Sequence, residues 1–159
     1  MNFDAIDRAI LAVLQVDASL TNQELAARVN ISPPTCLRRV KRLEDDGVIA
    51  ARIAVLGLDR LAALQGHGLT AVIEITLDRQ GDEHLQAFEQ RVLDEAAVQQ
   101  CYRVSPGPDF VLIVHVRDMP AYQQFSQRVL AGQANVRNVK AFFSIRRAKF
   151  SPAVPLVGD

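Results

Sequence analysis

The sequence has little of what several common protein classes need. Its two cysteines, Cys36 and Cys101, are too few for a disulfide framework. Both lie among apolar neighbours, so we expect them to be reduced side chains in a core. The chain has no run of about 18 apolar residues, the length that a membrane helix requires, and its N-terminus lacks the basic start of a signal peptide. We therefore expect a cytoplasmic protein that does not contact a membrane.

Motifs of catalysis and metal binding are also missing. The chain contains no G-x-x-x-x-G-K-[ST], G-x-G-x-x-G or G-x-S-x-G pattern. His67, His84, His115 and the cysteines fall in no H-x-x-x-H or C-x-x-C pair. These absences predict no catalytic residue, no metal ligand, no cofactor and no enzyme activity. A metal- or redox-sensing regulator stays as the alternative, because His115 or Cys101 could be brought together across a dimer.

Charge of one sign is not in excess. Lysine and arginine together number 18, as do aspartate and glutamate, so the net charge is zero. This balance excludes a protein that coats nucleic acid by bulk charge. The 159 residues, of which 49% are hydrophobic, allow one or two domains with real cores.

Residues 21–47 are the most informative stretch that is present. They read as two short helices joined by a tight turn. Thr21 and Glu24 form a capping box at the first helix start. Ser32 precedes two prolines, which are tolerated in a first helical turn, and Gly47 is a typical helix stop.

The second of these helices sorts into two faces at about 100° per residue. One face gathers Cys36, Leu37, Val40 and Leu43, and the other gathers Thr35, Arg38, Arg39 and Arg42, with Lys41 at the flank. Capped helix, turn and cationic second helix match a helix-turn-helix, whose second helix reads the major groove of double-stranded DNA. The alternative is a solvated charged face. Candidate DNA-binding residues are Ser32, Thr35, Arg38, Arg39, Lys41 and Arg42.

Two segments complete the predicted first domain, residues 1–56. A helix over residues 4–16 has an apolar stripe and Asp4 as its cap. The β-prone residues 48–56 predict a two-stranded wing. Arg52 in that wing would contact a DNA phosphate, or would be a solvated loop arginine.

The remainder predicts a second domain. Residues 57–68, punctuated by glycine, read as a linker or hinge. Periodicity then predicts strands at 69–77, 98–105, 110–117 and 136–147 and helices at 82–95 and 119–131. This order is that of a ferredoxin-like βαββαβ domain over residues 69–149, with an antiparallel sheet and both helices on one face. The chain is thus α+β, and residues 150–159 form a tail that is either disordered or braces assembly.

The strand at 110–117 is apolar on both faces. Val111 and Ile113 point one way, opposite to the residues that face the helices. A sheet covered by helices on one side should be polar on the other, so the second face needs a cover. We expect a homodimer formed through this face.

The segment I-S-P-P-T-C-L-R-R-V-K-R-L-E-D-D-G-V-I and the opening F-D-A-I-D-R-A-I-L resemble the Lrp/AsnC family of feast/famine regulators, and the resemblance covers residues 3–149. It implies a winged helix-turn-helix followed by a RAM/ACT-like ferredoxin domain. It also implies transcriptional regulation, an amino-acid effector, and dimers that assemble further into octamers.

One turn departs from the family pattern. Members usually carry G-D-x-D-[YF] near the effector crevice, where this chain has S-P-G-P-D-F at 105–110. Ser105, Gly107 and Asp109 are the candidate effector-binding residues, and Asp109 is the one that matches. Asp109 could bind an effector amino group or could stabilise the turn. The prolines remove two backbone amides, so a regulator that has lost its effector response is an alternative.

Overall fold

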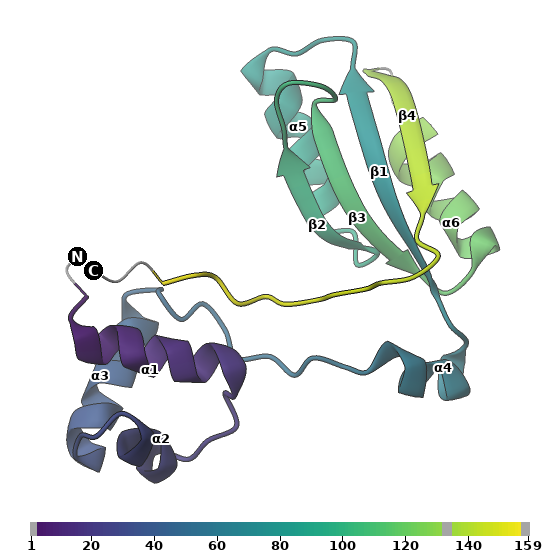
Figure 1. Ribbon diagram of the computed structural model, residues 1–159. Helices are drawn as coiled ribbons and strands as arrows, with labels where there is room; N and C mark the ends of the chain where they lie inside the picture. The colour runs from purple at the N-terminus through teal and green to yellow at the C-terminus, as the bar shows by residue number, and fades with distance from the viewer. Residues whose placement is uncertain (1–2, 132–134, 157–159) are drawn as a thin grey trace. The chain divides into compact units, whose positions relative to one another are not determined.

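The computed structural model describes residues 3–131 and 135–156 (Figure 1). The chain forms two compact units. One consists of the residues up to Val55 together with the segment from Lys149 onward, and the other is Leu56–Ala148. The C-terminal segment therefore belongs to the same unit as the first helices. No helix in the described ranges combines the length and the apolar character needed to span a membrane.

Three helices form the N-terminal unit: α1 (Ala5–Val16), α2 (Asn22–Arg28) and α3 (Pro33–Asp45). The predicted capping boxes are present at Asp4 and at Thr21. The core of the unit consists of Ile10, Leu11, Leu25, Ala26, Cys36, Val40 and Leu43. Leu37, expected on this buried face, is instead 59% exposed, because it lies at the edge of the apolar stripe.

The turn between α2 and α3 has a Schellman geometry. The amide of Ile31 donates to the carbonyl of Ala26, and the amide of Asn30 donates to that of Ala27. Asn30 has a positive φ of 55°, a conformation that asparagine tolerates better than most residues. The side chain of Asn22 also donates to the carbonyl of Pro33, which ties the two helices together at 2.8 Å. These bonds fix where α3 begins.

The predicted two-stranded wing is wrong for this structure. Residues 48–56 contain no strand, and the side chains of Ile53, Val55 and Leu56 are exposed. β-prone composition produces a strand only where a neighbouring strand offers hydrogen bonds. Among the described residues of the first unit, residues 48–55 lie beside α1, the loop that follows it and the C-terminal segment, none of which is a strand.

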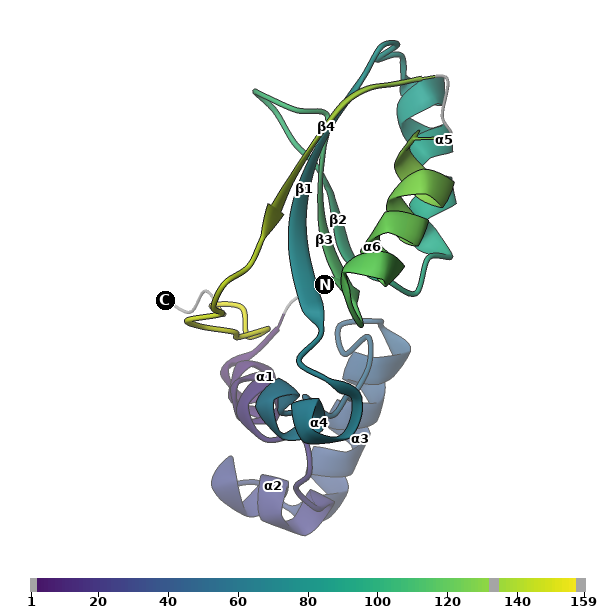
Figure 2. The same ribbon diagram turned by 90° about the vertical axis from the view of Figure 1, so that its right-hand side faces the viewer.

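The second unit begins with α4 (Leu58–Gln65), which lies in the segment expected to be a linker. A four-stranded antiparallel sheet follows, in the order β2-β3-β1-β4. Its strands are β1 (Leu69–Leu77), β2 (Val98–Arg103), β3 (Phe110–Val116) and β4 (Val136–Phe143). Helices α5 (Asp82–Leu93) and α6 (Met119–Phe125) cover one face of the sheet (Figure 2). The predicted α+β class and ferredoxin-like order are confirmed.

Several predicted elements end differently. Strand β4 stops at Phe143, which pairs with Ala71 of β1, rather than at residue 147; one further hydrogen bond follows, from the Ser144 amide to the Thr70 carbonyl. Strand β2 stops at Arg103, which pairs with Phe110, the first residue of β3. The helix expected over 119–131 changes to π-helical turns over Ser126–Ala131.

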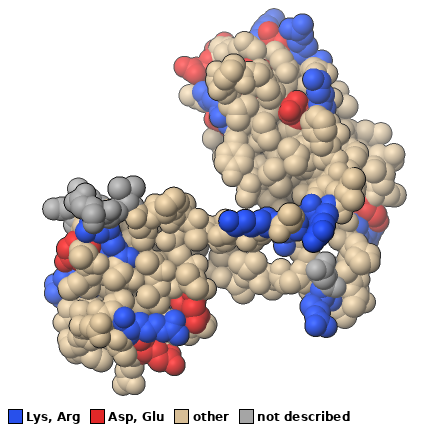
Figure 3. Space-filling model, viewed as in Figure 1, with Lys and Arg blue, Asp and Glu red and all other residues tan. Residues whose placement is uncertain are grey.

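The two faces of the sheet differ in cover. Strand β3 alternates between buried residues on the helix side and half-buried residues on the open side, which include Val111 and Ile113. Tyr102 and Phe142 on the open side are 51% and 53% exposed. Uncharged residues make up most of this face (Figure 3), although Glu74 lies opposite Val111 and Lys140 opposite Glu74 in the strand register. The expected apolar character of both faces of β3 is confirmed.

Candidate nucleic-acid interface

The start of α3 exposes the first candidate residues. Ser32 is the N-cap but makes no cap hydrogen bond with its side chain; its hydroxyl donates to Thr35 Oγ1 at 2.8 Å. Arg38 and Lys41 are exposed, and no ion pair with an acidic side chain of the described residues involves either. The N-terminal half of α3 is therefore open to a partner.

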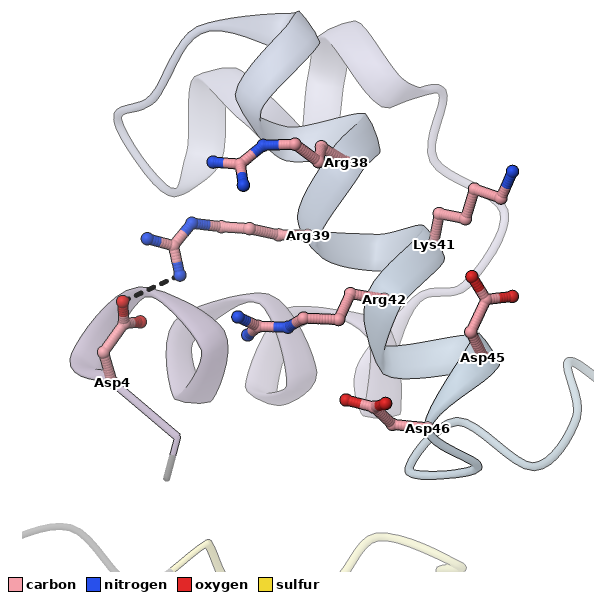
Figure 4. Close-up of a pocket in the computed structure, with 7 residues that line it drawn as sticks. All are labelled: Asp4, Arg38, Arg39, Lys41, Arg42, Asp45 and Asp46. Carbon is pink, nitrogen blue, oxygen red and sulfur yellow. Dashed lines mark hydrogen bonds and ion pairs between the residues drawn. The ribbon is translucent and has the colours of Figure 1, made fainter. Parts of the chain in front are cut away.

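A surface hollow of ≈ 510 Å³ lies beside this helix (Figure 4). Its lining consists of Asp4, Arg38, Arg39, Lys41, Arg42, Asp45 and Asp46. The three arginines extend from the same side of α3, whereas Lys41 and Asp45 lie on the other side (Figure 4). Cationic and anionic side chains line the same hollow, so the carboxylates offset part of the positive electrostatic potential of α3.

Arg39 is tied to the first helix. Its Nη1 atom lies 2.8 Å from Asp4 Oδ2 and 2.8 Å from Asp7 Oδ1. The Arg39 side chain is 17% exposed, whereas that of Asp7 is 1% exposed. The hydrogen bonds to Asp7 and then Asp4 raise the pKa of Arg39. The backbone amide of Asp7, followed by Arg39, lowers the pKa of Asp4.

Arg42 and Arg52 also have acidic partners. Arg42 Nη2 lies 2.6 Å from Asp7 Oδ2, and its side chain remains 48% exposed. Arg52 Nη2 lies 2.7 Å from Glu44 Oε1 on the end of α3. Both pairs are partly exposed, so an anionic ligand could compete for either cation.

Sequence reasoning missed Asp7. The signal was present, because Asp7 stands three residues before Ile10 and four before Leu11, on the apolar stripe of α1. A carboxylate at such a position needs a buried partner. The sequence also left the role of the C-terminal tail undecided. In the structure the tail is bound to α1, because Gln15 Nε2 donates to the carbonyl of Val154 at 3.2 Å and the amide of Val154 donates to Gln15 Oε1 at 2.7 Å.

The candidate effector turn lies between β2 and β3. Ser105 and Gly107 are exposed there, and the Ser105–Pro106 peptide bond is cis. Asp109 already has partners, because its Oδ2 accepts from the amide of Leu77 at 2.6 Å and from Gln80 Nε2 at 3.3 Å. The Asp109 carboxylate thus joins the turn to the end of β1.

Residues relevant to the metal or redox alternative are dispersed. Cys36 is buried and Cys101 half-buried, and burial raises the pKa of both thiols. His115 Nδ1 lies 2.9 Å from Thr70 Oγ1. Across residues 3–131 and 135–156, no group of three histidine, cysteine or acidic side chains is placed to hold a metal.

Comparisons with known proteins cover both units. Residues 3–50 match winged helix-turn-helix DNA-binding domains, and residues 70–154 match the Lrp/AsnC ligand binding domain. The chain is 38% identical over 149 residues to the leucine-responsive regulatory protein of Rhizobium meliloti, covering 94% of this chain and 93% of that one. It is 36% identical over 153 residues to an uncharacterized HTH-type transcriptional regulator of Haemophilus influenzae, covering 96% and 89%.

A solved structure extends the likeness. A transcriptional regulator from Neisseria meningitidis, crystallised as a complex with L-Met, matches with a TM-score of 0.84 at 30% identity, covering 97% of each chain. Both halves of the fold, the helix-turn-helix and the antiparallel sheet with its helices, therefore occur together in proteins with related sequences. The chain belongs to the Lrp/AsnC family and is a DNA-binding transcriptional regulator of that type.

Proposed function

We propose that α3 enters the major groove of double-stranded DNA and that its exposed N-terminal half reads the sequence. The observation that carries this is the exposed Arg38, near the start of a helix whose position is set by hydrogen bonds to α2. Of the two arginines considered for a bidentate contact to guanine, we assign Arg38, because Arg39 is occupied by two carboxylates. Ser32 and Thr35 would contact DNA near the helix start.

The remaining cations are proposed to bind phosphate. Lys41 is exposed, and Arg42 and Arg52 are exposed enough to exchange their acidic partners for phosphate oxygens. Such contacts set register and salt dependence rather than sequence preference.

The experiment compares Arg38→Ala with wild type on a duplex that the wild-type chain has enriched from a random-sequence pool. Loss of a bidentate base contact should weaken binding roughly 5- to 150-fold, corresponding to about 1–3 kcal/mol. Arg91→Ala, which removes an exposed cation from α5 in the other unit, is the matched control. Equal affinities of Arg38→Ala and wild type would contradict the assignment of α3.

We infer that the protein works as a homodimer formed through the open face of the sheet. The half-buried Val111 and Ile113 and the exposed Phe142 support this, because an uncovered apolar face favours self-association. Two-fold symmetry would also present two recognition helices to successive major grooves, about 34–36 Å apart. The family relationship extends the proposal to octamers built from such dimers.

We further propose an amino acid as the effector of the sheet domain. The match to the Lrp/AsnC ligand binding domain and the L-Met complex of the Neisseria meningitidis regulator support this class of ligand. Ser105 and Gly107, exposed in the β2–β3 turn, are the proposed contacts, with Asp109 as a possible third. A regulator without effector response is the second candidate, favoured by the bond from the Asp109 carboxylate to a β1 amide.

We propose that the protein acts in the cytoplasm, where its DNA would be found, without a cofactor and without catalytic activity. The regulator names of its relatives support a role other than catalysis.

A further inference from the structure

Asp7 is the charged side chain that the fold buries among the described residues, with 1% of its surface exposed. Part of its role is local, because it completes the capping box of α1. The Asp7 amide donates to Asp4 Oδ1 at 2.8 Å, and the Asp4 amide donates to Asp7 Oδ2 at 3.3 Å. A capping box, however, works equally well with an exposed acid. Burial of this carboxylate is costly and requires a further explanation.

The explanation lies on the recognition helix. Each Asp7 oxygen accepts from a different arginine of α3, Arg39 at 2.8 Å and Arg42 at 2.6 Å. One buried carboxylate thus joins the start of α1 to two successive turns of α3. Asp4 adds a second bond to Arg39 from the N-cap position.

The two arginines are held to different degrees. The Arg39 side chain is 17% exposed and that of Arg42 is 48% exposed. The Nε atom of Arg39 is buried and has no hydrogen-bond partner in the described part of the chain. Arg39 is therefore committed to the interior of the unit, whereas Arg42 keeps much of its surface.

We propose that Asp7 is a positioning residue for DNA recognition, which removes Arg39 from the DNA-contacting set and directs Arg42 along α3. The inference rests on the proposed entry of α3 into the major groove. Because the three arginines extend from one side of α3 (Figure 4), all three would otherwise compete for the same phosphates. Asp7 leaves Arg38 to contact bases and keeps non-specific attraction low.

The test measures how salt affects DNA binding by the full-length chain, on the enriched duplex and on a random-sequence duplex of equal length. Asp7→Asn should steepen the slope of log affinity against log salt by about 0.9 for each arginine released to phosphate. Affinity for the random-sequence duplex should rise, and the ratio of the two affinities should fall about fivefold or more. Asp45→Asn is the control, because Asp45 carries the same charge on the other side of α3 and makes no ion pair with a described residue. A slope and a ratio equal to those of Asp45→Asn would overturn the proposal.

A second pair of variants tests the positioning role of Asp7 even if Asp7→Asn does not fold. Lys41→Met, which removes a proposed phosphate contact, should make the slope shallower by about 0.9, whereas Arg39→Met should leave it unchanged. Equal losses in the two variants would overturn the role of Asp7 and leave the DNA-binding role of α3 standing. An unchanged slope in Lys41→Met would instead contradict the proposed function itself. A residue with only a structural role would not separate the two salt slopes.

Discussion

Asp109 decides between two interpretations of the β2–β3 turn. Its carboxylate accepts from the Leu77 amide at 2.6 Å, and its own amide donates to the carbonyl of Ile75 at 2.8 Å. Asp109→Ala would remove the first of these bonds and leave the amide at the end of β1 without its acceptor. If the residue is structural, the sheet unit should be destabilised.

The magnitude follows from the type of bond. A hydrogen bond to a charged group contributes about 1.5–3 kcal/mol, and the half-buried position of Asp109 suggests roughly 2 kcal/mol for Asp109→Ala. The bond from Gln80 is 3.3 Å long and exposed, and should add little. Asp109→Asn keeps an acceptor oxygen and should cost about half as much. Asp78→Ala, an exposed neighbour, should stay within about 0.5 kcal/mol of wild type.

The chain offers a selective assay for this unit. It has two tyrosines, Tyr102 and Tyr122, and no tryptophan. Both tyrosines lie in Leu56–Ala148, so tyrosine fluorescence during urea denaturation reports the sheet unit alone. Equal urea midpoints for wild type and Asp109→Ala would refute the structural role. A thermal-shift screen against the amino acids completes the comparison, since a ligand shift lost without a loss of stability would assign Asp109 to the effector.

Three further predictions concern assembly, pH and the tail. Ile113→Lys should yield monomers by light scattering, whereas Gln86→Lys on exposed α5 should not; a fully dimeric Ile113→Lys would contradict the dimer face. The lowered pKa of Asp4 stabilises the folded state above its unfolded pKa of about 4. The advantage of wild type over Asp4→Asn in urea, followed by circular dichroism, should therefore vanish as pH falls through the folded pKa. Gln15→Ala loses two hydrogen bonds to the tail and should speed amide exchange in α1 about fivefold, a loss of roughly 1 kcal/mol, whereas exposed Gln23→Ala should not.

Features decided by neighbours in the sequence were predictable. The capping box at Thr21 and the stop at Gly47 depend on a few adjacent residues, and the structure has both. Strand β1 has the predicted bounds, because alternation of apolar residues marks a strand wherever one face is buried. The wing depends instead on which strand lies alongside, and local composition carries no information about that partner.

The cations of α3 show the same difference between features set by neighbours in the sequence and features set by tertiary partners. Angular sorting placed Arg38, Arg39 and Arg42 together, and they do extend from one side of the helix (Figure 4). It could not show that a carboxylate 32 residues earlier, Asp7, holds Arg39. Charge near a helix is a local property of sequence, but pairing of that charge is a tertiary property. A charged residue on the apolar stripe of α1 was the one local sign of it.

The ion pairs of Arg39 with Asp4 and Asp7 also explain why a chain of zero net charge would need to bind DNA as an assembly. With Arg39 held internally and Arg38 assigned to bases, each chain offers about three phosphate contacts, from Lys41, Arg42 and Arg52. At a slope of about −0.9 per contact, a fourfold rise in salt lowers the affinity of a monomer roughly 40-fold and that of a dimer with about six contacts roughly 10³-fold. A monomer has few contacts to lose and correspondingly little affinity to begin with. In the proposed dimer, the acidic partners on α1 would thus make DNA binding depend on the symmetric pairing of two chains, and hence on the open face of the sheet.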